Sequence, residues 1–557
     1  MSADGDQIAF QNSIANNSDP VLFQDKNYTF ITDSTSNSGS FSSGQIQFDL
    51  STLNSMSQWV SLPEATIEFP IKITTQLSAA AVGTPGNSSA TILAAINKCG
   101  FHQWIDSVQL TINGQCIAAA QPYENVAASF RILSTWSQDT LKKWGPTCGI
   151  ALDDMTGDIS APAAAIDSVG LHNATASTVA TSAKGFDCVT NQTILGNKGV
   201  LARAKYNYTG AATTLAGAII GTSGMVNAGI ANGASASASN TAGTYLSSLY
   251  VMATVRVKDL IDITQFPLVK NLRGFLYLSF NSATVALTGT TGGGFSSVAI
   301  TPMTGRTCPF MINTGAITFG AGSTSGPVIT VVGTVDATTT GQVPGSAPLL
   351  TNARLICPYY IANPKVDEAL TRTQQFSTLE KIVNPITASA SQTVNYTITV
   401  GVPNPHRLIL LPMWQNLGGA SFLSNPEISC FDSVPATSGP FAYLNNLQVY
   451  VANKPMYQYP ISYDFEQWVS EQSQLGANGA MTNEMTSGLL SQQLWQQNHR
   501  YYAINLSRGL DSENGASRSI QVSFTNPSST YGLKVIAIVQ YEKKWTIQTA
   551  QCMLQSA

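Results

Sequence analysis

At 557 residues the chain is too long for one hydrophobic core, since single cores stop growing at about 250 to 300 residues. Charged residues make up 10% of the chain, against roughly 25% in an ordinary soluble domain, and the net charge is −4. No run of Lys or Arg occurs, which argues against direct nucleic-acid binding, because that needs cations clustered over phosphates. Sparse charge favours extensive contact between subunits, although a secreted β-protein can have the same composition.

The N-terminus and the cysteines bear on the compartment. The stretch MSADGDQIAF lacks the basic and apolar regions of a secretory signal, so we expect no signal peptide. The eight cysteines include no C-x-x-C pair, and we expect reduced, buried thiols in a cytosolic assembly, with a few disulfides as the alternative. They are Cys99, Cys116, Cys148, Cys188, Cys308, Cys357, Cys430 and Cys552.

Residues 1–40 are polar and rich in Asn, Ser and Asp, and we interpret them as an extended N-terminal arm. Strand patterns follow at 44–50 (GQIQFDL) and 65–75 (ATIEFPIKITT), where apolar and polar residues alternate with a period of two. This alternation indicates half-buried antiparallel strands. We therefore expect a first β-sandwich over residues 41–300.

Residues 152–247 form a low-complexity segment within that sandwich, dominated by Ala, Ser, Thr, Gly and Asn. Small residues cannot supply the bulky side chains of a core. Apolar runs such as 215–220 are much shorter than the roughly 18 residues that a membrane-spanning helix needs, so we expect no membrane span. We interpret the segment as a long loop insertion that contributes to an outward tower.

The second half of the chain resumes the strand patterns. We interpret residues 301–345, rich in Gly and Thr, as a connector, residues 346–547 as a second sandwich, and residues 548–557 as a polar C-terminal tail. Residues 535–539 are apolar on both faces, which is typical of a central strand. The arm and the tail lie outside both sandwiches, and we expect them to connect neighbouring subunits. Helical spacing occurs in few places: Val126, Phe130 and Leu133; Phe465, Trp468 and Val469; and Leu490, Leu494 and Trp495.

Two stretches of the chain repeat one pattern. IDSVQLTINGQ begins at Ile105 and LNNLQVYVANK begins at Leu444, and each is an alternating strand that leads through a turn and a Pro into a short amphipathic helix. A later pair of strands, YLSFN and QVSFTN, continues the match and places Leu276 beside Ile520. Four markers in the same order favour a duplication, whereas chance similarity between two β-domains is the alternative.

The spacing between these markers locates the difference between the halves. Leu278 lies 170 residues after Val108, and Val522 lies 75 residues after Leu447, so the halves differ by 95 residues. That difference nearly equals the length of the insertion at 152–247. The sequence therefore predicts an all-β protein of two tandem eight-stranded jelly-roll sandwiches, a double jelly roll, with few short helices and long loops.

The patterns of known active sites are absent from the sequence. The four histidines, at 102, 172, 406 and 499, fit no metal-ligand spacing, and neither G-x-S-x-G nor a Walker phosphate loop occurs. GAGSTSG at 320–326 lacks the Lys of a phosphate loop and is interpreted as a turn. We expect no catalytic, cofactor-binding or metal-binding residues, no cofactor, and no enzyme activity.

Two weaker features leave alternatives open. Asp153, Asp154 and Asp158 are either solvated loop carboxylates, which we favour, or a cation site. Trp136, Trp144, Trp468 and Trp495 either pack short helices onto the sandwiches, which we favour, or stack on sugars.

Four stretches carry a resemblance to a known family: 23–73, 444–468 (LNNLQVYVANKPMYQYPISYDFEQW), 487–508 (SGLLSQQLWQQNHRYYAINLSR) and 538–547 (IVQYEKKWTI). Together they resemble the major capsid proteins of polinton-like viruses and virophage-related elements, except across 152–247. The resemblance implies a double jelly-roll subunit that trimerises into pseudo-hexameric capsomers, which tile an icosahedral shell around double-stranded DNA.

The same resemblance implies a virion protein that is assembled inside the host cell. Its partners would be further copies of itself, minor capsid or penton proteins and cement proteins, without sequence-specific nucleic-acid binding. The alternative is a jelly-roll receptor-binding or carbohydrate-binding spike or tail protein. A glycoside hydrolase would need a carboxylate pair, for which the charged residues offer no clear candidate.

Overall fold

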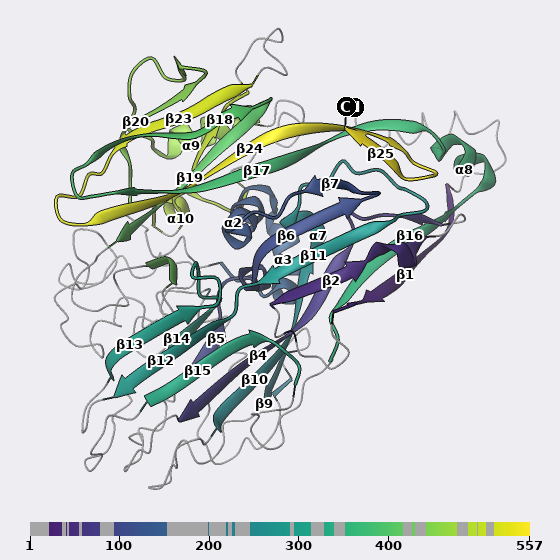
Figure 1. Ribbon diagram of the computed structural model, residues 1–557, viewed down its shortest axis with the longest axis horizontal. Helices are drawn as coiled ribbons and strands as arrows, with labels where there is room; N and C mark the ends of the chain where they lie inside the picture. The colour runs from purple at the N-terminus through teal and green to yellow at the C-terminus, as the bar shows by residue number, and fades with distance from the viewer. Residues whose placement is uncertain are drawn as a thin grey trace.

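The computed structural model describes residues 22–35, 41, 44–54, 58–77, 94–152, 199, 219–220, 225–228, 245–289, 295–313, 328–338, 351–415, 426–428, 442–475, 488–497, 499–507 and 517–556. Antiparallel sheets dominate this part of the chain and its helices are short, so the predicted fold class is confirmed. Figure 1 shows two β-rich units, the first from purple to teal and the second from green to yellow.

The first unit is a jelly roll built from eight strands in two sheets. Counted along the chain, its first strand pairs with the eighth, the second with the seventh, the third with the sixth and the fourth with the fifth. This is the order of a long antiparallel hairpin rolled into a sandwich. The strands are β1 (Phe23–Thr32), β2 (Gln45–Asp49), β4 (Thr66–Leu77), β6 (Ile105–Ile112), β7 (Gln115–Ala118), β10 (Tyr245–Arg256), β11 (Gly274–Phe280) and β16 (Arg354–Ala362).

The second unit has the same strand order. One sheet runs β17-β24-β19-β22 and the other β18-β23-β20-β21, which again pairs first with eighth, second with seventh, third with sixth and fourth with fifth. The strands are β17 (Thr373–Ala388), β18 (Thr393–Val402), β19 (Pro405–Gln415), β20 (Asn445–Val451), β21 (Lys454–Pro455), β22 (Tyr502–Asn505), β23 (Arg518–Thr525) and β24 (Gly532–Gln548). The central strand predicted at 535–539 is confirmed within β24, which has β17 on one side and β19 on the other.

The repeated pattern marks equivalent strands, because β6 and β20 occupy the same position in their sheets. Each is followed by a tight turn whose first amide is held by the neighbouring strand: Asn113 N donates to Arg273 O, and Ala452 N to Ser519 O, both at 2.9 Å. The predicted match between the later strands is wrong by two residues. Leu110 and Val449 are equivalent, because each lies three residues before that first turn amide. Leu110 faces Leu276 and Val449 faces Val522, so Leu276 corresponds to Val522 rather than to Ile520.

Helices occupy the same place in both units, between the fifth and sixth strands. Helical spacing predicts them correctly around Phe130 and Trp468, both of which are buried, although Val469 of the second set is 40% exposed. Of the third predicted set, Leu494 and Trp495 lie in a helix and Leu490 precedes it. The first unit carries α2 (Glu124–Thr135) and α3 (Gln138–Cys148), and the second carries α9 (Phe465–Leu475) and α10 (Gln492–Gln497). Two shorter helices, α7 (Val257–Leu260) and α8 (Pro364–Leu370), follow β10 and β16.

The predicted boundary between the units is misplaced. The expected connector at 301–345 contains β15 (Val328–Val335), which pairs with β4, and β14 (Phe310–Asn313), which pairs with β5 (Ala94–Asn97). With β12 (Ala283–Gly289) and β13 (Phe295–Pro302), β15 widens one sheet of the first unit. β16, expected to open the second sandwich, closes the first. Within 301–345 the Gly- and Thr-rich composition concealed β15, whose Val331 and Val335 are buried.

The chain ends behave differently from the predicted arm and tail. Of residues 1–40, Phe23–Thr32 form β1, an edge strand paired with β16. Of residues 548–557, β25 (Met553–Ser556) folds back on β24, and Cys552 and Leu554 are buried. Backbone and side-chain bonds tie this tail to the first unit, including Lys270 N to Thr549 O at 2.9 Å and Asn271 Nδ2 to Ala550 O at 2.8 Å. The tail therefore fastens the two units of one chain together.

Several predicted features lie mostly outside the described residues. Within 152–247 the structure describes β8 (Ile219–Ile220) and β9 (Met225–Ala228), which extend the sheet beside β10, together with the start of β10 itself. Asp153, Asp154 and Asp158, the loop at 320–326 and His172 are outside the described ranges.

Strand pairing beside the turn generates a stability prediction. Gly274 has φ +153°, and a Cβ there would lie 2.0 Å from Thr111 O, so we expect Gly274→Ala to destabilise the chain by about 3 kcal/mol or more. Gly114 also has positive φ, but no atom lies within 4 Å of its Cβ position, so Gly114→Ala should cost about 1 kcal/mol. Urea unfolding followed by Trp fluorescence measures both, and equal costs would contradict the close-approach explanation.

Candidate functional site

The described residues contain no group of three or more His, Cys, Asp or Glu side chains placed to hold a metal ion. His102, His406 and His499 lie on different elements and are not brought together. Across the same described part of the chain, no helix is long and apolar enough to cross a membrane. The distinctive chemistry of the molecule lies instead where its two units meet.

The predicted Trp residues serve packing. Trp136, Trp468 and Trp495 are at most 2% exposed, which leaves no ring face for a sugar. Trp468 and Trp495 meet between α9 and α10 with ring centroids 6.3 Å apart. Trp136 and Trp144 both contact the guanidinium of Arg256, at 4.5 and 5.4 Å.

Six cysteines lie in the described part of the chain, and none of them forms a disulfide. Five are buried and Cys116 is half-buried, so the predicted burial holds for all but one of them. Burial raises the pKa of Cys148, Cys357 and Cys552 to about 12, which suppresses the reactive thiolate. Cys188 and Cys430 lie outside the described residues.

Helix α2 of the first unit packs directly against the second unit, and we call this contact the junction. The Phe130 ring packs edge-on against Trp468, with centroids 6.0 Å apart, and against Tyr501 at 5.5 Å. Leu489 N donates to Leu133 O at 2.8 Å, which caps the C-terminal part of α2 with backbone from the other unit. Gly488 has φ +67°, and a side chain there would collide with Leu133 O. Aromatic packing and a backbone hydrogen bond therefore join α2 directly to the second unit.

A buried ion pair crosses the junction. Lys381 Nζ on β17 bonds the Glu124 carboxylate at the start of α2, and the two side chains are 11% and 2% exposed. Desolvation lowers the pKa of Lys381, an effect that the Glu124 charge opposes. Removing one partner of such a pair leaves a buried charge without compensation, which is far more costly than removing both.

A second polar link joins the units nearby. Glu427, 3% exposed, bonds Lys534 Nζ on β24 and accepts a hydrogen bond of 3.4 Å from the Tyr123 hydroxyl, immediately before α2. Burial is the first cause that raises the pKa of Tyr123, and the Glu427 carboxylate adds to it. Tyr123 therefore remains a protonated donor at neutral pH.

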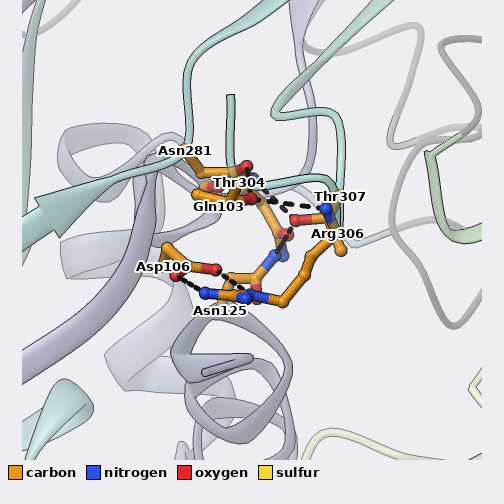
Figure 2. Close-up of polar contacts among 7 residues, drawn as sticks. All are labelled: Gln103, Asp106, Asn125, Asn281, Thr304, Arg306 and Thr307. Carbon is orange, nitrogen blue, oxygen red and sulfur yellow. Dashed lines mark hydrogen bonds and ion pairs between the residues drawn. The ribbon is translucent and has the colours of Figure 1, made fainter. Parts of the chain in front are cut away.

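The opposite side of α2 is held by a buried polar network in the first unit (Figure 2). Asn125 Nδ2 donates to Thr307 Oγ1 at 2.9 Å and to Gln103 Oε1 at 3.3 Å. Asn281 Nδ2 bonds the same Thr307 oxygen at 2.6 Å, and Arg306 forms a two-point pair with Asp106 at 3.0 and 2.6 Å. Hydrogen bonds to Gln103, in a short 3-10 helix, and to Thr307, in a loop, thus hold Asn125 and help to position α2.

His102 of the first unit also contacts α2 through a hydrogen bond. Its Nε2 lies 2.8 Å from Ser129 Oγ on α2, and burial lowers the pKa of His102 to about 3. The imidazole is therefore neutral under physiological conditions, and protonating it requires water to reach the interior.

The sequence did not single out the charged residues of the junction. Glu124 follows Pro122 at the expected start of a helix, but nothing in the sequence shows that its partner lies 257 residues later, at Lys381. One available signal is the scarcity of charge. In a chain with 10% charged residues, a Glu or Lys between apolar neighbours deserves consideration as a buried pair.

No family model and no curated protein match this chain. Among solved structures, a chain of the Sputnik virophage is similar at 12% identity over 96% of this chain and 89% of that one, with a TM-score of 0.49. The mavirus major capsid protein is similar at 10% identity over 95% and 90%, with a TM-score of 0.45. The Faustovirus major capsid protein is similar at 11% identity over 95% and 91%, with a TM-score of 0.41.

Two of these three structures are named major capsid proteins, the class that the sequence resembles. The resemblance is confirmed at the level of fold, since the strand order of the chain's own two units is that of a double jelly roll. At these identities and TM-scores, what the similar proteins do does not transfer to this chain.

The buried ion pair predicts an asymmetric set of stabilities. Glu124→Gln should lower the free energy of unfolding by about 3 to 5 kcal/mol, because Lys381 is left buried without its partner. Combining Glu124→Met with Lys381→Met should recover most of the loss. The exposed pair Asp139 and Lys142 is the control, and Asp139→Asn should change urea unfolding little. A double variant no more stable than Glu124→Gln would contradict this account.

The lowered pKa of His102 predicts acid sensitivity. Because the folded pKa of about 3 lies below the ordinary 6.5, the unfolded chain binds the extra proton, so stability is complete above pH 6.5 and declines as the pH falls towards 3. The loss is about 1.4 kcal/mol per pH unit for this histidine. Burial also lowers the pKa of His406, to about 4, so His406 contributes a second proton over part of that pH interval.

Urea unfolding of the wild type and of His102→Gln at several pH values tests this prediction. Below pH 6.5, the free energy of unfolding should fall less steeply with decreasing pH in the variant than in the wild type, and the difference in slope corresponds to one proton. Carboxylates contribute equally to both proteins. Identical slopes would show that His102 is accessible to protons in the folded chain.

Proposed function

We propose that this chain is the major capsid protein of a double-stranded DNA virus and acts through assembly rather than catalysis. The observation that carries the proposal is the occurrence of two jelly rolls with identical strand order in one chain, locked together through the buried junction. A rigid pair of like units is a building block with two similar corners. Three such chains arranged around one axis supply six similar corners and form a pseudo-hexagonal capsomer.

Tiling follows from that shape. Pseudo-hexagonal capsomers cover a surface with few kinds of contact, and contacts between different faces of neighbouring copies close into a shell when the rotation between them closes. The homotrimer would be the soluble unit, and the icosahedral shell around the genome its assembled form. Minor capsid, penton and cement proteins would occupy the positions and seams that the trimers leave open, and the mature chain would reside in the virion.

Two surface properties support self-association. The chain carries few charges, so burying its surface requires little desolvation of ions. The edge strand β1 also exposes Tyr28 and Phe30, at 66% and 62% of their surface. Exposed aromatic residues on a strand edge promote association, and a second copy of the chain would cover them. Absence of Lys and Arg runs fits a shell that encloses DNA without sequence-specific contact.

A carbohydrate-binding function receives less support. Sugar binding on a sandwich uses exposed aromatic rings, whereas Trp136, Trp468 and Trp495 are buried in the helices and strands. The described surface exposes the rings of Tyr28 and Phe30 on the edge strand β1, and of Tyr459 on a different part of the chain, at 72%. A structural role therefore explains more of the molecule.

Size-exclusion chromatography with light scattering tests the proposal on the purified chain. We expect a stable species of three chains, and electron micrographs at high protein concentration should show pseudo-hexagonal particles or shells. Replacing Tyr28 and Phe30 by Ser should weaken the trimer without lowering the unfolding temperature, because both side chains are already exposed. Met303→Ser, at another exposed position, is the control. A monomer that binds glycans would overturn the capsid proposal.

A further inference from the structure

A cavity of about 310 Å³ opens beside the junction. Its walls come from α2 and α7 of the first unit and from strands β17, β19 and β24 of the second. Phe130 and Trp136 form its apolar part, and several charged side chains converge on it. The volume is at the lower end of the range for small-molecule sites.

The charges that line this cavity do not balance. Asp259 is fully engaged, since Arg256 donates to both of its oxygens at 2.8 Å and Trp136 Nε1 donates at 3.1 Å. Three further cations, Arg131, Lys258 and Arg407, line the same space. The remaining carboxylate facing them is Asp262, which already accepts the Thr264 hydroxyl at 3.1 Å. The lining therefore has a surplus of positive charge.

Two buried polar atoms of the second unit lack partners within the described residues. Arg407 and Gln540 face each other across β19 and β24, and both line the cavity. Arg407 Nε and Gln540 Oε1 are buried and make no hydrogen bond there, and Gln540 is 4% exposed. Buried polar groups are nearly always satisfied, so an unpaired donor beside surplus cations indicates a missing acceptor. Rotation of the Gln540 amide would present a second donor to the same acceptor.

We propose that this cavity binds a small oxyanion, with phosphate or a free carboxylate as the matching chemistry, between Arg131, Lys258 and Arg407. Guanidinium groups bind such anions through parallel N–H bonds, and a low-charge, partly enclosed site strengthens them. The Arg407 guanidinium lies over the Phe130 ring, 5.5 Å from the ring centroid. A cation would be repelled by the lining, and an apolar ligand would leave the buried donor unpaired.

The electrostatics of Arg407 agree with this geometry. Desolvation is the main cause that lowers the pKa of Arg407 to about 10; the Arg131 charge acts in the same direction, and the Asp262 charge opposes it. A bound anion would favour the charged form of Arg407.

Binding would connect the two jelly rolls. Arg131 and Lys258 belong to the first unit, whereas Arg407 and Gln540 belong to the second. An anion held by both sides binds the folded, joined chain and not the unfolded one, so it raises the unfolding temperature by mass action. This role is independent of trimer formation and of the capsid function.

Thermal unfolding and titration calorimetry of the full chain test the proposal, with inorganic phosphate and with acetate, each against chloride at equal ionic strength. We expect saturable binding of at least one of the two anions and a rise in unfolding temperature at about 10 mM. A response to phosphate alone would identify a phosphate site, and a response to acetate identifies a carboxylate site. Arg407→Met and Lys258→Ala should each weaken binding about tenfold or more, while Lys142→Ala, on the exposed face of α3, should bind as the wild type does.

Two controls keep the outcome decisive. Circular dichroism checks that Arg407→Met is folded, and the half-buried Lys258 provides a second variant that does not touch the strand core. The absence of saturable binding by either anion, or binding that is unchanged in both variants, would overturn the proposal. Light scattering on the same samples separates anion binding from any change in oligomeric state.

Discussion

The arrangement of this molecule depends on one helix that is buried from both sides. Asn125 and Ser129 attach α2 to the first unit through hydrogen bonds, while Phe130 and Glu124 engage the second. Because a helix held on both flanks cannot rotate or slide without breaking bonds in both units, it fixes the angle between the two sandwiches. The tail at 549–556 adds a second attachment at another place.

The junction is built from equivalent parts of a duplicated architecture. α2 and α9 follow the same strand in their units, and they meet through Phe130 and Trp468. The two copies are nevertheless unequal, since the widening strands β12, β13 and β15 of the first unit have no counterpart among the described residues of the second. Duplication supplies the similar corners, and the added strands distinguish one end of the first unit from the corresponding end of the second.

Local alternation predicted the fold well, because it reflects burial on one face of a strand. It identified β6 and β20 as equivalent, but a shift of two residues leaves every side chain on the same face, so the match of Leu276 with Ile520 escaped detection. The boundary was misplaced since β15 and β16 belong to the first unit through pairing with β4, and pairing over hundreds of residues leaves no local pattern. The partners Glu124 and Lys381 were hidden for the same reason.

Buried charge at the junction is better explained by specificity than by stability. Two apolar sandwich faces can pack in several registers, each displaced by one pleat, at similar free energy. The pair of Glu124 with Lys381 and the hydrogen bond from the Tyr123 hydroxyl to Glu427 cross between the units and can form in one register only. Every other register would bury the Glu124 and Lys381 charges without partners. Desolvation of these ions therefore destabilises the incorrect registers more than the correct one. A chain whose two units must keep one fixed angle gains more from such selection than from the small net stabilisation that a buried ion pair provides.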